Sequence, residues 1–360
     1  MRLRFLHHFL IISLAMMLVA CGEASKKFSK DFMPSAKGDI GEIMVVADSG
    51  QWEADLGATL MSILRQPMQG LPQDEPLFSV HKISPDKLNN TLKSSANMIF
   101  LMTLDSKTTE SKILKGFLTQ ESLQMIRKDT SLYMSIRRDE FAKGQVILYL
   151  FANTEAQLNA KLIQNREKIQ LLFEKRERER MVKKLYKSHD KQMEKTVFGR
   201  HQFKMDVPFG WEQAASSDGF YWMRYFNNDK EQNIFIYYEP YTTADVFNDI
   251  PLFRDMITRK YLRDGEKNGL FIERQMRDDL QAVFTNQTHF KGHYAIESRG
   301  LWKISDNSLG GPYISYTFVD IDQKRVYYIE GYVAAPGSKK RILLQEVDAI
   351  LSTFRTILIK

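Results

Sequence analysis

Cysteine is nearly missing from this chain, which has one thiol in 360 residues. A single cysteine excludes an internal disulfide framework and any cysteine-ligated zinc or iron–sulfur site. The sequence also lacks a G-x-G-x-x-G or Walker phosphate-binding loop, an H-E-x-x-H metal motif and a G-x-S-x-G nucleophile elbow. We therefore predict no catalytic residue, no metal site and no cofactor, and we favour a protein without enzymatic activity.

Apolar runs long enough to span a bilayer are missing as well. The longest, Phe9–Ala20, has twelve residues, whereas a membrane-spanning helix needs roughly 20. Because this run follows the basic residues Arg2 and Arg4, it is typical of a signal peptide, and we expect residues 1–20 to be removed.

The only cysteine stands directly after this run. Residues 18–21, Leu-Val-Ala-Cys, resemble a bacterial lipobox. That resemblance implies cleavage before Cys21 and attachment of a diacylglycerol to its sulfur. An ordinary signal peptide with a chance cysteine is the alternative, but the lone thiol occupies the one position that a lipobox requires. Two or more acyl chains anchor a protein stably, and residues 21–39 suit a flexible tether.

This interpretation places the mature protein in the cell envelope. Gly22 is not the aspartate that keeps some bacterial lipoproteins in the inner membrane, so we expect the outer membrane, facing the periplasm. Loss of Arg2 and Arg4 lowers the formal net charge from +7 to +5. A mild positive charge permits contact with anionic lipid or polysaccharide. Nucleic acid is not an expected partner, since no stripe of basic residues alternates with aromatic ones.

The length predicts two domains, and the first is expected at residues 40–193. Apolar runs predict strands at residues 42–47, 78–83, 97–104 and 145–151. Helical spacing of apolar residues predicts helices at 53–66, 85–93 and, as a long linking helix, from Thr154 onward. This alternation predicts an α/β layer with a partly parallel sheet. Ligands often bind beyond the carboxyl ends of such strands, here at Asp48, Ser49, Gly50 and Trp52, although a plain strand-to-helix turn is favoured because no phosphate-binding motif is present.

The second domain is expected at residues 197–360. Strands are predicted at 199–207, 220–226, 233–238, 289–303, 313–319 and 325–334, and helices at 244–263 and 339–356. Runs of strands followed by a closing helix predict an α+β fold, with an antiparallel sheet and helices packed on it.

Six segments of the chain form a distinctive set: GLPQDEPLF (70–78), ERERMVKKLYKSHDKQ (177–192), FKMDVPFGW (203–211), RGLWKI (299–304), GGPYISY (310–316) and EGYVAAPGSKKR (330–341). Together they resemble an uncharacterised family of bacterial lipoproteins, the domain of unknown function 4837. The likeness extends from about Gly41 to the end of the chain and implies a surface-anchored protein, but it implies no activity and no catalytic residue. The element order after residue 197 is also loosely similar to the PsbP-like fold.

Two basic clusters are candidate ligand contacts. Arg299, Trp302 and Lys303 lie beside a glycine-rich turn, where a guanidinium and an indole suit a sugar or a carboxylate. A buried Arg–Glu pair with Trp302 in the core is the favoured alternative. The second cluster opens the last helix, where cations are unfavourable unless an anion sits on the free N–H groups; solvated side chains are the alternative for Lys339, Lys340 and Arg341.

For three histidines the sequence favours a structural role over metal binding or catalysis. His289 and His293 have the spacing of metal ligands on a helix, but their run predicts a strand. Four residues at about 3.3 Å each would separate the imidazoles by about 13 Å, too far to share one ion. His201 shares an apolar face with Phe203 and Met205, which favours a core histidine over a general base.

The sequence therefore predicts a lipid-anchored envelope protein that binds a ligand or a partner without catalysing a reaction. An envelope hydrolase acting on peptidoglycan, lipid or polysaccharide is the alternative, because a catalytic set could assemble from residues distant in the sequence.

The anchor is tested by the variant Cys21→Ser. Serine provides no sulfur for the diacylglycerol, so the variant should accumulate as an unlipidated precursor that does not label with palmitate. Metabolic labelling followed by membrane fractionation measures this directly. Palmitate labelling equal to that of the parent chain would show that Cys21 is not the attachment site.

Overall fold

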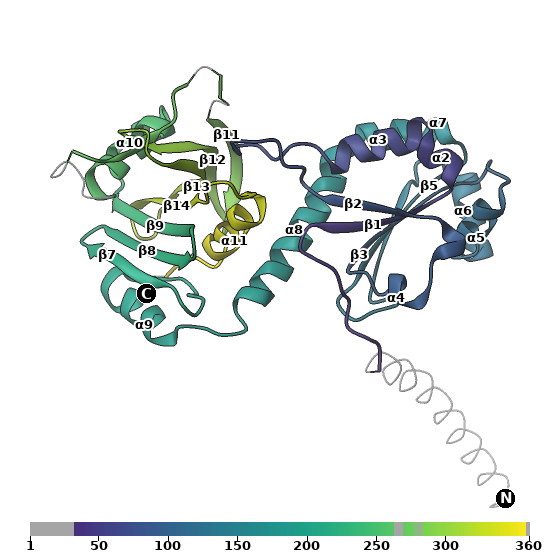
Figure 1. Ribbon diagram of the computed structural model, residues 1–360, viewed down its shortest axis with the longest axis horizontal. Helices are drawn as coiled ribbons and strands as arrows, with labels where there is room; N and C mark the ends of the chain where they lie inside the picture. Colours follow the sequence, from purple (N-terminus) through teal and green to yellow (C-terminus); the bar gives the residue numbers. More distant parts are fainter. Residues whose placement is uncertain (1–31, 263–268, 278, 281–282, 358–360) are drawn as a thin grey trace, which may run out of the picture. The chain divides into compact units, whose positions relative to one another are not determined.

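The computed structural model describes residues 32–262, 269–277, 279–280 and 283–357 (Figure 1). The chain divides into unit 1, Met1–Arg65 with Phe78–Phe173, and unit 2, Gln66–Leu77 with Glu174–Lys360. The boundary expected between residues 193 and 197 thus falls inside unit 2. The signal peptide and Cys21 lie outside the described residues. The end of the expected tether is bound to unit 1, since the Ala36 N–H donates to the Lys143 carbonyl at 2.9 Å.

Unit 1 is built on a mostly parallel sheet with the strand order β2-β1-β3-β5-β4. Only the edge strand β4 runs antiparallel to its neighbour within this described sheet. Strands β3 and β5 are buried along their whole length, as expected for strands covered on both faces. The predicted α/β layer is confirmed, with strands β1 Glu42–Ala47, β2 Ser79–Ile83, β3 Asn97–Thr103, β4 Met134–Arg138 and β5 Val146–Ala152.

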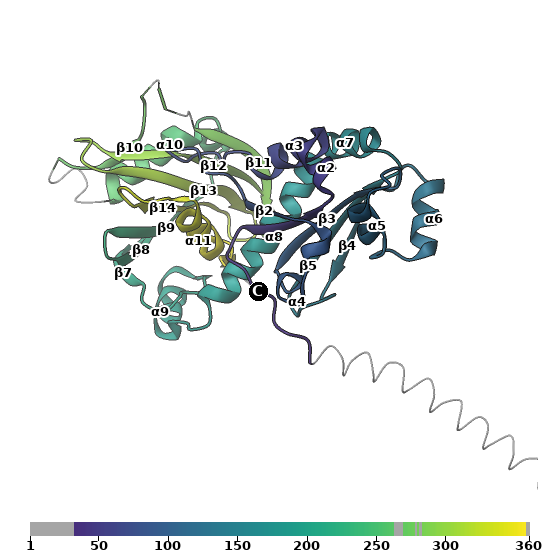
Figure 2. The ribbon, with the colours of Figure 1, turned by 45° about the vertical axis from the view of Figure 1, so that its right-hand side comes forward.

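Helices cover both faces of this sheet. Helices α3 and α7 contact each other on one face, while α5 and α6 pack on the other against Val46, Phe100 and Tyr149 (Figure 2). Thr154 caps α7, since its Oγ1 accepts from the Gln157 N–H at 3.3 Å, but the long helix expected from Thr154 onward is interrupted after Gln164. The helices are α2 Ser49–Glu53, α3 Asp55–Leu64, the 3-10 turn η1 Pro85–Lys87, α4 Asn90–Lys93, α5 Thr109–Lys115, α6 Gln120–Lys128 and α7 Glu155–Gln164.

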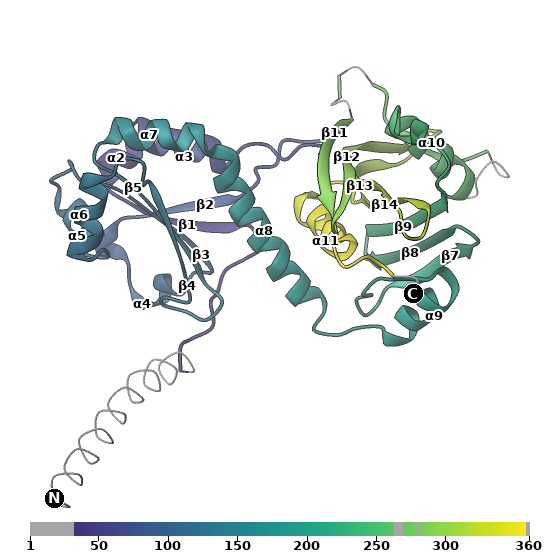
Figure 3. The ribbon, with the colours of Figure 1, turned by 180° about the vertical axis from the view of Figure 1, so that it is seen from behind.

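Unit 2 is built on an antiparallel sheet with the strand order β10-β12-β13-β14-β9-β8-β7, and β11 also pairs with β12. The predicted antiparallel sheet is therefore confirmed, and Figure 3 shows it from behind. Its strands are β7 Glu212–Ser217, β8 Phe220–Asn227, β9 Lys230–Pro240, β10 Ile272–Arg274, β11 Phe284–Phe290, β12 His293–Ile304, β13 Gly310–Asp320 and β14 Arg325–Ala334.

The two faces of the unit 2 sheet form separate cores, because successive strand residues point to opposite faces. Helix α11 packs on one face, where Val347 and Ile350 join the core. Helix α10 packs on the other, where Ile257 joins Trp302. The remaining elements of the unit are α9 Lys191–His201, the 3-10 turn η2 Ala244–Phe247, α10 Ile250–Tyr261, α11 Arg341–Leu351 and the short strand pair β6 Phe203–Lys204 with β15 Arg355–Thr356. Helix α8, Arg166–Leu185, contains the boundary between the two units.

Two predicted strands differ from the structure. The first half of the strand expected at 199–207 is the end of α9, and the chain leaves the helix through Gln202, whose φ of 60° is left-handed. Apolar side chains alternate with polar ones only from Phe203 onward, so the pattern does not determine the conformation of residues 199–202. The strand expected at 289–303 is a hairpin, β11 and β12, whose turn residues Lys291 and Gly292 have φ of 52° and 91°.

The segment Gln66–Leu77, which lies between α3 and β2, contributes to the core of unit 2. Met68 and Leu71 are buried in the core that α11 shares. Gly70 has a φ of 80°, and a Cβ there would lie 2.9 Å from the Arg299 Cβ, so only glycine permits this close approach. The Glu75 carboxylate accepts hydrogen bonds from the Lys340 N–H at 2.6 Å and the Arg341 N–H at 3.2 Å. This carboxylate therefore caps the start of α11.

We expect the variant Glu75→Gln to destabilise unit 2. An amide of the same shape removes the negative charge and one acceptor, and a buried donor left without a partner costs about 1–3 kcal/mol. Urea unfolding of the mature chain measures the loss. The neighbouring exposed Asp74→Asn should change stability by less than about 0.5 kcal/mol. Equal losses in the two variants would contradict the capping role.

Candidate functional site

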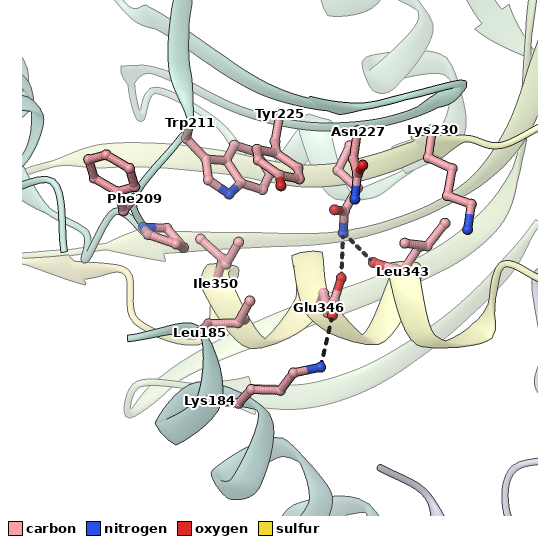
Figure 4. Close-up of a pocket in the computed structure, with 12 residues that line it drawn as sticks. Lys184, Leu185, Phe209, Trp211, Tyr225, Asn227, Lys230, Leu343, Glu346 and Ile350 are labelled. Carbon is pink, nitrogen blue, oxygen red and sulfur yellow. Dashed lines mark hydrogen bonds and ion pairs between the residues drawn. The ribbon is translucent and has the colours of Figure 1, made fainter. Parts of the chain in front are cut away.

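A pocket of about 390 Å³ opens on the α11 face of unit 2 (Figure 4). This volume lies within the range of small-molecule sites. Its walls come from the end of α8, the turn before β7, the β8–β9 hairpin and one side of α11. The lining residues are Lys184, Leu185, Pro208, Phe209, Trp211, Tyr225, Asn227, Lys230, Gln232, Leu343, Glu346 and Ile350.

One wall of the pocket is aromatic. The chain turns at Gly210, whose φ is 90° and where a Cβ would lie 3.3 Å from the Tyr225 ring. This turn brings the Trp211 indole onto Tyr225, with ring centroids 6.0 Å apart and planes tilted by 24°. Phe209, on the other side of Gly210, is 73% exposed. A largely exposed phenyl ring beside two stacked rings is suited to contact the flat face of a ligand.

The opposite side of the pocket is polar. The Gln232 side chain donates from Nε2 to the Leu343 carbonyl at 3.1 Å and to the Glu346 carboxylate at 3.2 Å. Lys184 Nζ lies 3.9 Å from the same carboxylate, and Lys230 stands at the rim (Figure 4). Burial raises the pKa of Glu346 above its ordinary value. Two ammonium groups against one carboxylate make the lining positive, which suits a ligand with a negative charge.

These lining residues were not predicted from the sequence. Only the fold shows that Phe209 and Trp211 face α11. Gln232 occupies a strand position directly opposite Tyr225, and Glu346 lies three residues after Leu343 on one side of α11. A helix and a hairpin more than 100 residues apart in the sequence meet here, so no local pattern could have joined them.

The predicted anion site at the start of the last helix is occupied by the protein's own carboxylate. Helix α11 begins at Arg341, and Glu75 already accepts from the N–H groups of Lys340 and Arg341. The Lys340 ammonium donates to the Ser338 carbonyl at 2.9 Å, whereas Lys339 is exposed. An external anion is thus not needed to offset the cations, and the expectation is corrected on this point.

The other predicted contacts, Arg299, Trp302 and Lys303, do not converge. The Arg299 Nε donates to the Glu297 carboxylate at 2.7 Å, while Trp302 is buried and its Nε1 donates to the Val333 carbonyl at 3.2 Å. An odd separation along β12 places Arg299 and Trp302 on opposite faces. Lys303 lies 3.3 Å from Glu273. The arrangement matches the alternative of a braced Arg–Glu pair and a core tryptophan.

The histidines have structural surroundings. In the β11–β12 hairpin His289 pairs with Tyr294 and His293 pairs with Phe290. The two imidazoles therefore lie on opposite faces of the hairpin. They are separated by the sheet and not, as expected, by distance along one strand. Among the described residues, no group of three or more His, Cys, Asp or Glu side chains could hold a metal ion. No helix in the described part of the chain is both long and apolar enough for a membrane span.

His201 is a buried core histidine. Its Nε2 lies 2.9 Å from Ser216 Oγ and its Nδ1 lies 3.1 Å from the Tyr238 hydroxyl. Burial, with a smaller contribution from Arg200, lowers the pKa of His201 to about 4. The ring is therefore neutral at physiological pH.

Two family models match the chain. Residues 188–353 match the domain of unknown function DUF4837, and residues 36–186 match the domain of unknown function DUF8532. The family predicted from the sequence motifs is thus confirmed for the C-terminal part. The sequence motifs predict that the same family extends back to about Gly41, whereas residues 36–186 match DUF8532. Among curated proteins, none matches the chain.

Similar solved structures share little sequence with this chain. A mutant of the protein Mog1 has 11% identity and a TM-score of 0.29, over 43% of this chain and 91% of that one. The Ran-binding protein Mog1p of Saccharomyces cerevisiae has 10% identity and a TM-score of 0.29, over 43% and 90%. LpqN of Mycobacterium tuberculosis, described as involved in cell envelope biogenesis, has 14% identity and a TM-score of 0.26, over 44% and 83%.

The low pKa of His201 predicts a stability that depends on pH. An unfolded histidine takes up a proton near its ordinary value of 6.5, but the folded one does so only near 4. The unfolded chain therefore binds more protons between these values, and stability falls as the pH is lowered from 6.5 towards 4. The variant His201→Gln should lose stability less steeply over this range in urea unfolding. The exposed His289→Gln should follow the parent chain, and identical slopes in all three would refute the assignment.

Proposed function

We propose that this chain, whose C-terminal part carries the DUF4837 domain, is a lipid-anchored binding protein of the bacterial outer membrane. Cys21 would hold it there through its acyl chains, and the pocket of unit 2 would bind the ligand. The lipobox-like residues 18–21 support the anchor, and the lining of the pocket supports the binding role.

The ligand that fits this lining best is an acidic polysaccharide. Sugar rings have apolar faces that pack on aromatic side chains, and Phe209 with Trp211 and Tyr225 forms such a surface. The lysines suit the carboxylates of acidic sugars, and Gln232 and Asn227 can hydrogen-bond to hydroxyl groups. The aromatic wall facing a positive polar side is the observation that carries the proposal.

The composition of the lining favours binding over hydrolysis. The described residues that line the pocket include no serine, cysteine or histidine, so no side chain there pairs a hydroxyl or thiol nucleophile with an imidazole base. Glu346 is the only carboxylic acid among them, whereas hydrolysis of a glycosidic bond generally uses a pair of carboxyl groups.

Binding of alginate oligomers to the mature chain tests the proposal. Isothermal titration calorimetry should show binding of alginate, a chain of uronic acids, and none of neutral dextran oligomers. Phe209→Ala should weaken alginate binding about fivefold, because an aromatic contact is worth about 1 kcal/mol. Lys184→Gln should also weaken it and should reduce its dependence on salt.

Matched controls use neighbours that do not line the pocket. Phe226→Ala removes an exposed aromatic ring of β8 that does not line the pocket. Lys183→Gln removes the exposed cation next to Lys184. Both controls should bind like the parent chain. If dextran binds as well as alginate, or if Phe209→Ala and Phe226→Ala weaken binding equally, the pocket is not a site for acidic glycans.

A further inference from the structure

The order in which the chain adds strands to the unit 1 sheet reverses between β1 and β3. From β1 the chain runs to α2 and α3 on one face of the sheet, and from β3 it runs to α5 on the other (Figure 1). The strand order places β2 on one side of β1 and β3 on the other. Such a switch point, at the carboxyl ends of the strands, is where open α/β sheets bind their ligands.

Polar side chains meet at this switch point, and those of Asp48, Gln51 and Thr103 are buried. Asp48 follows β1, and its carboxylate accepts from the Gln51 N–H at 3.2 Å and from the Thr108 hydroxyl. The Gln51 amide donates from Nε2 to Thr103 Oγ1 at 2.6 Å, and this hydroxyl donates to Asp105 at 2.6 Å. The loops after β1 and β3 are thereby tied to each other through side chains.

A second group of polar residues lies beside the first. Lys82 Nζ donates to Ser49 Oγ at 2.7 Å and to Ser84 Oγ at 2.9 Å. The Glu110 carboxylate accepts from the Ser49 N–H at 2.5 Å and from its hydroxyl at 3.1 Å. The carboxyl ends of β1 and β2 and the first turn of α5 thus carry hydroxyl, ammonium and carboxylate groups within one network.

One acceptor atom of this network, Gln51 Oε1, has no hydrogen-bond partner. Gln51 is 7% exposed, and its Oε1 has no hydrogen-bond partner in the structure. The amide lies between Thr103 and the Glu155 carboxylate, to which Nε2 has a long contact of 3.5 Å. A buried acceptor without a partner is costly, and a donor from a bound molecule would remove that cost.

The charges of the network select the ligand. Four carboxylates take part, those of Asp48, Asp105, Glu110 and Glu155, whereas the ammonium groups are those of Lys82 and Lys115. The Lys115 ammonium group already binds the loop after β3, because its Nζ donates to the Leu104 carbonyl at 3.0 Å. The network is therefore rich in acceptors and negative, so it favours a ligand with positive charge and several donors.

We propose that the carboxyl edge of the unit 1 sheet, between β1 and β3, binds a small organic ammonium compound that carries hydroxyl groups. The ammonium group would be held by Glu155 and the unpartnered Gln51 Oε1, and the hydroxyl groups by the serines and Glu110. This site is independent of the pocket in unit 2, where the chemistry has the opposite sign.

Calorimetric titration of the mature chain with glucosamine tests this proposal. Glucosamine carries an ammonium group and several hydroxyl groups, whereas glucose and N-acetylglucosamine carry no charge. We expect glucosamine to bind and the two neutral sugars to bind at least about tenfold more weakly, because a hydrogen bond to a charged group strengthens binding by about tenfold or more. Equal binding of all three sugars would overturn the requirement for an ammonium group.

Two variants locate the site. Glu155→Gln should weaken glucosamine binding about tenfold, and Gln51→Met should also weaken it while it removes the unpartnered oxygen. The control Glu167→Gln changes an exposed glutamate in the first turn of α8 and should bind like the parent chain. Thermal unfolding of each variant shows whether it is folded. Undiminished binding in a folded Glu155→Gln chain would refute the site, as would calcium binding that competes with glucosamine.

The test is separate from that of the proposed function. Phe209→Ala, which affects the pocket of unit 2, should leave glucosamine binding unchanged. If it weakens glucosamine binding, the sugar occupies that pocket and the unit 1 proposal fails, while the alginate experiment still decides the role of the pocket.

Discussion

The contact between the Glu75 carboxylate and the first N–H groups of α11 holds several parts of unit 2 in place. It attaches the segment Gln66–Leu77 to a helix 265 residues further along the chain. Helix α11 in turn packs closely on the sheet, since a Cβ at Gly331 would lie 2.7 Å from the Val347 side chain. An adjoining side of α11 presents Leu343, Glu346 and Ile350 to the pocket. The shape of the pocket therefore depends on a cap that comes from outside the C-terminal part of the sequence.

Ion pairs lie on both faces of the same sheet, and the pair on the α10 face is fully buried. On the α10 face the Arg254 guanidinium makes two hydrogen bonds to the Glu330 carboxylate, at 2.7 and 2.8 Å, and both side chains are fully buried. On the α11 face Arg178 lies 2.8 Å from Asp348, which also accepts from the Tyr316 hydroxyl at 2.7 Å. Removal of Arg254 or Glu330 alone would leave an uncompensated buried charge, so this pair favours the packing of α10 on its face of the sheet.

The two units carry polar groups of opposite character. The pocket of unit 2 combines aromatic rings with two lysines, while the network at the unit 1 switch point is rich in carboxylates. A protein that binds acidic sugars in one unit and amino compounds in the other would suit a polymer that carries both groups. The proposed anchor at Cys21 would hold both units at one membrane surface.

Local patterns in the sequence determined the elements whose signals are local. Continuous apolar runs predict β1, β3 and β5 to within a residue or two, because strands of a parallel sheet are buried on both faces. Thr154 marks the start of α7, since a cap acts on the next three residues. The alternation of strands and helices was enough to predict the two kinds of sheet. The lipobox-like residues are also local, and they are the whole basis for the expected anchor.

Tertiary structure alone decided the features that join distant residues. The sequence shows cations at the start of α11 but not that Glu75 reaches them, and it shows Trp302 but not that its indole reaches the Val333 carbonyl. The pocket unites residues from Lys184 to Ile350, and the switch point unites residues from Asp48 to Glu155. Side chains far apart in the chain meet only when sheets and helices pack, because packing rather than local preference sets their distances.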